Sequence, residues 1–377
     1  MKRITTISIF TLMLMMACVE PYAPQKIKSA ENFLVVDGFL DGSSGSAKIK
    51  LTHAIALSEN IPIPAEEGAT VTVEPVKGAT IPLSETDEGV YTADNLTFDE
   101  STAYRLRVKT TGGTEYTSDY IKLKKSPSLD SVVWRGTGKG VQFYVNGHDP
   151  FNQTTFYRYV FTETWEFRAT YVSDWMKIGG TPVFRNPITE QVYTCWRTQD
   201  SQEVLTASTR KLNEDVVSMY PINFIPKGSR MLSRTYSIKV QQRAISQEEF
   251  EYWDLIRKTT ESLGGLFDPL PSQVVGNVHN EDDPTEQVLG YFTGGYVQEK
   301  RIFVTMKDVP VDLQVVDPYD FPCETREIPY DKPELSGNDV LLSTIGIPPA
   351  LWLVGTPNCS DCTTLGGNNI KPDFWPQ

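Results

Sequence analysis

Short stretches in which apolar and polar residues alternate recur along most of the chain, and this period of two is typical of β-strands. The clearest case is YRLRVKTTGGTEYTSDYIKL, where Leu106 and Val108 alternate with charged residues. Gly112 and Gly113 between its two halves supply the positive φ of a hairpin turn. Six or seven such strands, separated by regular turns, predict an immunoglobulin-like sandwich over residues 32–125.

The chain after this sandwich is also rich in strand patterns. KKSPSLD, residues 124–130, indicates a boundary between domains, and SVVWR and GVQFYVNG predict a hairpin around GTGKG. FYRYVFTETWEFRATYV predicts one long strand with an aromatic row on one face. Such a row is either buried core or a sugar-binding platform, and only the glutamate within it favours the platform. The row consists of Tyr157, Tyr159, Phe161, Glu163, Trp165 and Phe167.

One amphipathic helix is predicted over residues 246–264. Ser246 is placed as N-cap and Glu249 as its capping-box partner, with Ile245 and Phe250 as a hydrophobic staple. Gly264 and Gly265 end the pattern. An apolar stripe follows one side of this helix and predicts packing on a sheet; it consists of Phe250, Trp253, Ile256 and Leu263.

These patterns together predict a mainly β fold with two domains. The first is the immunoglobulin-like sandwich of residues 32–125. The second, residues 126–377, is a larger β-rich domain that carries the helix 246–264. The 41 aromatic residues (7 Trp, 17 Tyr and 17 Phe) suit extended sheets more than helix bundles.

The N-terminal residues predict export and a lipid anchor. Residues 1–17 comprise a basic start, an apolar run too short to span a bilayer and a small residue before Cys18. This resembles a bacterial lipoprotein signal, in which Cys18 is lipidated (for example with palmitate) and becomes the first residue; an ordinary secretory signal is the alternative. Residues 18–31 predict a lipidated tether. Glu20 is compatible with an outer-membrane location and with exposure at the cell surface.

Four further cysteines predict disulfides in such an oxidising compartment: Cys195, Cys323, Cys359 and Cys362. A zinc site would want a second C-x-x-C, and a redox site would want a helix after Cys362, where TTLGGNN is turn-like instead. Pairing Cys359 with Cys362 would close a cramped loop. We therefore expect the crossed arrangement, in which Cys195 and Cys323 each take one of the two and fasten the tail to the body.

Charge and motifs argue against several classes of function. The formal charge of −13 becomes −15 when Lys2 and Arg3 leave with the signal, and such a surface repels nucleic acid. GTGKG (136–140) lies between strands and lacks the Lys-Ser/Thr ending of a phosphate loop. His53, His148 and His279 have no helical metal spacing. HNEDDP (279–284) could hold Ca²⁺, although a solvated acidic loop is commoner. We expect no cofactor and no enzymatic activity.

Several segments in combination resemble a known family. They are CWRTQDSQEVLTAST, the block from YSIKVQQRAISQ to FDPLPSQVVGNV, VLGYF, KRIFV and the tail CSDCTTLGGNNIKPDFW. They are similar to an outer-membrane lipoprotein family of Bacteroidota-type bacteria, known as the domain of unknown function forty-two forty-nine, with the likeness running from about Asn32 to Trp375. No catalytic residues are assigned in that family.

The resemblance implies a partner. Its members are commonly encoded beside TonB-dependent outer-membrane transporters, so we expect a non-enzymatic accessory of such a transporter that captures substrate or covers the barrel. The alternative is a scaffold of an envelope assembly complex or a surface adhesin, and a surface hydrolase is a third class.

Overall fold

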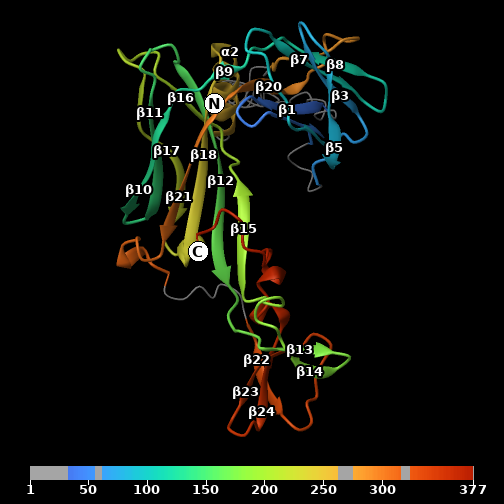
Figure 1. Cartoon of the computed structure of the whole chain (residues 1–377), viewed down its shortest axis with the longest axis vertical. Helices are drawn as coiled ribbons and strands as arrows, with labels where there is room; N and C mark the ends of the chain where they lie inside the picture. The colour runs from blue at the N-terminus through green and yellow to red at the C-terminus, as the bar shows by residue number, and fades with distance from the viewer. Residues whose placement is uncertain (1–32, 56–61, 262–274, 316–322, 377) are drawn as a thin grey trace, which may run out of the picture.

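The structure is a computed structural model that describes residues 33–55, 62–261, 275–315 and 323–376. The expected signal, Cys18 and the tether lie outside these residues. The described chain is mainly β, as the sequence predicts, and elongated: a sandwich and a central domain lie side by side, and a smaller lobe projects below the central domain (Figure 1).

The N-terminal sandwich consists of two sheets in the orders β5-β6-β2-β1-β20-β9 and β19-β8-β7-β3-β4. Alternate residues of each strand enclose a core that includes Val36, Ile49, Leu106 and Val108. Its first nine strands are β1 (Leu34–Asp41), β2 (Ser46–His53), β3 (Thr70–Pro75), β4 (Ile81–Pro82), β5 (Ser84–Asp87), β6 (Val90–Ala93), β7 (Tyr104–Lys109), β8 (Glu115–Ser118) and β9 (Lys124–Lys125).

Two strands from far along the chain complete this sandwich. β19 (Val278–Asn280) pairs with β8, and β20 (Leu289–Tyr296) pairs in parallel with β1. Gly290 permits the close pairing, because a Cβ there would lie 1.9 Å from the Val36 carbonyl oxygen. The sandwich therefore extends beyond the expected end at residue 125. Lys124 and Lys125, expected at a linker, form an edge strand on β20 instead.

The central domain packs two sheets face to face, β10-β11-β17 against β15-β12-β18-β21, with β16 also on β12. The expected hairpin is present, since β10 pairs with β11 around GTGKG. The elements are β10 (Leu129–Thr137), β11 (Gly140–His148), β12 (Phe156–Arg168), β15 (Thr194–Asp200), β16 (Leu205–Ser208), β17 (Val216–Pro226), β18 (Thr235–Ala244), β21 (Gln298–Thr305) and the 3-10 turns η1 (Arg230–Leu232) and η2 (Val311–Leu313).

The aromatic row of β12 is buried core. All six of its members are buried between the two sheets of the central domain. Glu163 is also enclosed, and its Oε2 accepts hydrogen bonds from the Tyr236 hydroxyl at 2.8 Å and from Asn223 Nδ2 at 2.9 Å. A buried carboxylate needs such donors, so Glu163 is part of an internal polar network and the row presents no platform to solvent.

The predicted helix is present as α2 (Gln247–Glu261), and Ser246 caps it by accepting from the Glu249 amide at 3.1 Å. The Glu249 side chain does not complete a capping box. It is buried and accepts from the Thr293 hydroxyl at 2.6 Å and from Trp253 Nε1 at 3.3 Å. The most buried residues of α2 are Glu249 and Tyr252, which are not members of the apolar stripe expected from the sequence. Leu263, the last residue of that stripe, lies outside the described residues. No helix in the described chain is long and apolar enough to cross a membrane.

Two arginines join the sandwich, the helix and the central sheet. Arg158 on β12 and Arg243 on β18 are cross-strand neighbours. The Arg158 guanidinium lies 3.6 Å from the ring centroid of Trp253 on α2, and that of Arg243 lies 3.7 Å from Phe39 on β1. Burial lowers the pKa of Arg243 to about 10. Cation–π contacts of this kind stabilise the joint without direct ion pairs.

The lower lobe was not predicted from the sequence. It contains the hairpin β13 (Trp175–Ile178) with β14 (Thr181–Phe184), and a sheet in the order β22-β24-β23. Trp352 is the centre of its small core, where Trp175 packs on its edge and Tyr330 stacks on its face. The strands of the sheet are β22 (Thr325–Pro329), β23 (Val340–Ile345) and β24 (Leu351–Gly355).

We expect Glu163→Gln to stabilise the protein above the pKa of the buried carboxyl. Burial raises the pKa of Glu163, although Tyr236 and Asn223 oppose the shift. A raised folded-state pKa means that the parent gains stability as pH falls and loses it as pH rises through that pKa. Urea unfolding at pH 8 should therefore show the variant as the more stable protein, with a difference that shrinks toward pH 5.

The control for this experiment is Glu327→Gln, because Glu327 is exposed on β22. It should leave the pH dependence of unfolding unchanged. A difference between Glu163→Gln and the parent that is independent of pH would contradict the assignment of Glu163 as a carboxyl penalised by burial.

Candidate functional site

Two disulfides hold the C-terminal tail against the rest of the chain. Cys195 on β15 pairs with Cys362, and Cys323 pairs with Cys359, with Cα–Cα distances of 5.8 and 5.1 Å. This is the crossed arrangement that the sequence predicts. Cys359 ends the 3-10 turn η3 (Pro357–Cys359), and Cys362 begins η4 (Cys362–Leu365). The Cys195–Cys362 bridge joins residues that are 167 positions apart in the sequence. It therefore holds the tail at the lower end of the central sheet, where Cys195 lies.

The tail then runs beside β15 and back toward the central domain (Figure 1). Gly367 permits this path, since a Cβ there would lie 2.5 Å from that of Cys195 and 2.6 Å from the Phe167 ring. Asn368 exchanges two backbone hydrogen bonds of 2.8 Å with Trp196. Trp375 is buried, and its ring lies edge-on to those of Trp196 and Phe303.

A cavity of about 690 Å³ lies where three segments meet: the tail, β15 and residues 172–192, which carry the β13–β14 hairpin and which we call the arm. We call it the waist cavity, because it lies between the central domain and the lower lobe. Volumes of this size are typical of small-molecule sites. Its walls are Val172, Ser173, Asp174, Phe184, Arg185, Pro187, Ile188, Gln191, Val192, Tyr193, Thr194, Trp196, Asn369 and Lys371.

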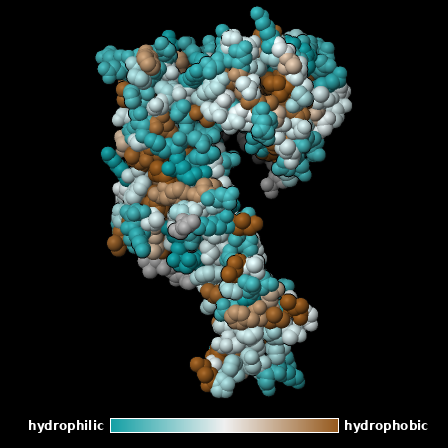
Figure 2. Space-filling view, viewed as in Figure 1, coloured by the Kyte–Doolittle hydropathy of each residue, from teal (hydrophilic) through white to brown (hydrophobic). Residues whose placement is uncertain are grey.

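Apolar side chains in this wall are open to solvent. Ile188 of the arm is 85% exposed and Phe184, at the end of β14, is 62% exposed. Figure 2 shows hydrophobic side chains gathered over the lobe where β13 and β14 lie. Exposed apolar residues that cluster beside a cavity indicate a binding surface.

The amide side chains of the waist cavity connect the arm to the tail. Gln191 Nε2 donates to the Thr194 and Asn369 carbonyls, both at 2.9 Å, and Gln191 Oε1 accepts from the Thr194 amide at 3.0 Å. Asn369 Nδ2 donates to the Gln191 carbonyl at 2.9 Å. These bonds shape the cavity from segments that lie 178 residues apart.

The three histidines each face a carboxylate. His53 lies 2.8 Å from Glu66, and His279 lies 3.5 Å from Asp119. His148 lies 2.7 Å from Asp130, and this hydrogen bond raises the pKa of His148. None of the three borders the waist cavity.

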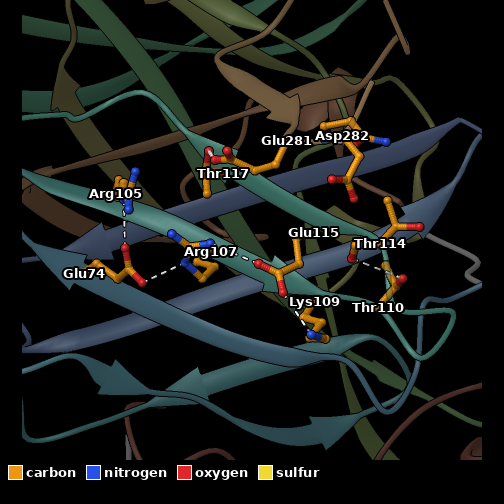
Figure 3. A network of polar contacts seen from close by, with 11 residues as sticks. Glu74, Arg105, Arg107, Lys109, Thr110, Thr114, Glu115, Thr117, Glu281 and Asp282 are labelled. Atoms are coloured by element: carbon orange, nitrogen blue, oxygen red, sulfur yellow. Dashed lines mark hydrogen bonds and ion pairs between the residues drawn. The ribbon is translucent and has the colours of Figure 1, made fainter. Parts of the chain in front are cut away.

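The acidic loop HNEDDP does not gather its carboxylates. Glu281 accepts a hydrogen bond from the Thr117 hydroxyl on β8. Beside this contact, Arg107 forms ion pairs with Glu74 and Glu115. The Asp282 carboxylate points away from the Glu281 carboxylate (Figure 3). Asp283 caps its own turn through Thr285. Among the residues that the structure describes, no group of three His, Cys, Asp or Glu side chains is placed to hold a metal ion.

The sequence drew attention to the cysteine tail but not to the cavity behind it. Arg185 and Ile188 lie in no motif, and the 171–193 segment has no long alternating run. Lys371 lies in the tail segment that resembles the family, but no feature of that segment marks it as a cavity residue. The only available signal was the expected attachment of Cys195 to the tail, which places residues beside Cys195 and residues after Cys362 in one neighbourhood.

Comparison with known families gives a clear match. A family described as "Domain of unknown function (DUF4249)" matches residues 19–301. The chain belongs to this family. The match ends before Cys323, so the family likeness is shown for the sandwich and most of the central domain but not for the tail, to which the sequence resemblance had been extended.

Other comparisons add little to the family. No curated protein matches the chain. Among solved structures, the Yersinia pseudotuberculosis adhesin InvE is similar at 17% identity and a TM-score of 0.13, over 56% of this chain. The chain spans about half the length of that adhesin chain, 55%.

Loss of the Cys195–Cys362 bridge should free the tail and open the waist cavity. The loop-entropy model gives roughly 5 kcal/mol for a loop of this length. We expect the Cys195→Ser/Cys362→Ser double variant to unfold at lower urea and to be cut by chymotrypsin after Phe374, a bond that the parent protects because Trp375 is buried. Equal rates of cleavage after Phe374 in both proteins would contradict this role of the bridge.

The matched control is Cys323→Ser/Cys359→Ser. That bridge closes a loop of 36 residues, so the same model gives roughly 4 kcal/mol. Because Cys195–Cys362 remains in this variant, we expect the bond after Phe374 to stay resistant to chymotrypsin.

Proposed function

We propose that this chain is a lipid-anchored outer-membrane protein that captures a substrate for a TonB-dependent transporter and performs no catalysis itself. The observation that carries the proposal is the waist cavity: open, largely apolar and built by a tail that a disulfide holds in place. A cavity that is already formed without ligand suits binding, since less of the chain has to be ordered when the ligand enters.

The N-terminal sequence supports the anchor. Lys2 and Arg3, the apolar run and Cys18 have the order of a lipoprotein signal. Two disulfides in the folded part suit an oxidising compartment outside the cytoplasm. A Bacteroidota-type source, an outer-membrane location and exposure at the cell surface belong to the same proposal.

The transporter is proposed from the family likeness. The chain belongs to the DUF4249 family, and the resemblance found in the sequence implies that members of the family are commonly encoded beside TonB-dependent transporters. An elongated body on a tether of about 14 residues can hold a ligand beside the mouth of a barrel in the same membrane. The negative charge of the chain disfavours nucleic acid as a partner.

The transporter proposal is tested by affinity purification of a C-terminally tagged chain from outer membranes in mild detergent, followed by mass spectrometry. We expect a TonB-dependent barrel in stoichiometric amount. Recovery of assembly factors would favour an envelope scaffold instead, and recovery of the chain alone an adhesin. Either result would overturn the transporter role.

Cys18→Ala should abolish the anchor without affecting the fold. We expect the variant to lose metabolic palmitate labelling and to leave the membrane fraction, because each acyl chain contributes roughly 0.8 kcal/mol per buried methylene. Ser29→Ala, a change in the same N-terminal segment, should keep both label and location. Labelling that persists in Cys18→Ala would show that Cys18 is not the lipidated residue.

A further inference from the structure

The apolar part of the waist cavity spans the arm and β15. Phe184 and Ile188 come from the arm, and Tyr193 and Trp196 come from the chain around β15. Trp196 is fixed by its backbone bonds to Asn368 and by the Trp375 ring. A ligand that fills this space removes exposed apolar surface from water, which favours binding.

The Gln191 amide has little capacity left for a ligand, whereas the Trp196 indole Nε1 is buried and makes no hydrogen bond within the described chain. Both hydrogens of the Gln191 amide and its oxygen already bond backbone groups, and Asn369 bonds the Gln191 carbonyl. Sugar recognition depends on such amide groups to read hydroxyls. A sugar that used the Gln191 amide would have to break the bonds that join the arm to the tail.

The charged side chains of the cavity do have capacity left. Arg185 Nε donates to the Ser173 carbonyl at 3.2 Å and Nη1 to the Glu190 carbonyl at 3.1 Å, and these bonds fix the guanidinium in place. Within the described chain, its Nη2 group makes no hydrogen bond, and the Lys371 ammonium has no hydrogen bond or ion pair. Two cations therefore remain available in the wall.

Charge balance at the cavity is opposite to that of the whole chain. The lining contains two cationic side chains, Arg185 and Lys371, and one anionic side chain, Asp174, whereas the chain has a formal charge of −13. A fixed arginine with free N–H groups is suited to a carboxylate. The acidic surroundings disfavour ligands with several negative charges, so a single carboxylate fits best.

We propose that the waist cavity binds apolar monocarboxylates, with the carboxylate at Arg185 and Lys371 and the apolar part against Phe184, Ile188 and Trp196. This inference rests on the proposed capture function and names its substrate class. The carboxylate of a short apolar peptide and that of a fatty acid share this chemistry. A volume of about 690 Å³ accommodates either a dipeptide or a medium-length acyl chain.

The test is isothermal titration calorimetry of the purified full chain with three probes: N-acetyl-leucyl-phenylalanine, its C-terminal amide and decanoate. We expect the acid to bind about fivefold to tenfold more tightly than the amide, in keeping with a partly exposed charge contact. The preference should shrink at high salt. Tighter binding of the dipeptide or of decanoate identifies the source of the carboxylate.

Two variants assign this binding to the waist cavity. Lys371→Gln should weaken binding of the acid toward that of the amide and leave the amide unchanged, whereas Lys139→Gln, in an exposed turn, should change neither. Ile188→Ser should weaken both probes, whereas Ile63→Ser, equally apolar and exposed on the sandwich, should have no effect. All four sites are exposed, so each variant is expected to keep the parent's unfolding curve.

Three results would overturn the inference: equal affinity for acid and amide, no binding of any probe, or tighter binding of a neutral maltooligosaccharide that depends on Ile188. The transporter proposal fails separately. A barrel that co-purifies with a chain indifferent to these acids leaves the transporter role intact. If the chain binds these acids but no barrel co-purifies with it, the inferred ligand class stands and the proposed transporter role is rejected.

Discussion

The burial of one face of β12 is the constraint on which the central part of the structure depends. This 13-residue strand pairs with β15, β16 and β18, and its aromatic row fills the space between two sheets. Its upper end places Arg158 beneath the helix, where it contacts Trp253. Its lower end places Phe167 opposite Cys195, and there the tail is attached. One strand thus links the joint with the sandwich to the waist cavity.

The disulfide at Cys195 converts this local pairing into a site. A surface tail gains little from its own packing and has to be restrained by links to the body. Cys362 and the Trp375 ring provide such links at two points, and the residues between them lie along the edge of β15. These links hold the backbone of the tail, Lys371 included, beside the sheet that forms the other wall of the cavity.

Much of the fold could be predicted from the sequence because its signals are local. The alternation in β7 and β12, the glycine pair between β7 and β8 and the cap at Ser246 depend on nearby residues only. The pairing of β20 with β1 could not be foreseen, since parallel strands need a long crossover and leave no turn signal. Glu249 was misplaced for a similar reason: its partner Thr293 is 44 residues away. The lower lobe has short strands, and the charges of the waist cavity come from segments that only the tertiary fold brings together.

Hydrogen–deuterium exchange with saturating N-acetyl-leucyl-phenylalanine tests the central claim, that the waist cavity is the binding site of this chain, most directly. The account predicts slower exchange in two separate peptides, one covering the 184–196 segment and one covering the tail around Lys371, with no change in the sandwich. Protection confined to the sandwich or to the β10–β11 hairpin, with the tail unchanged, would contradict it.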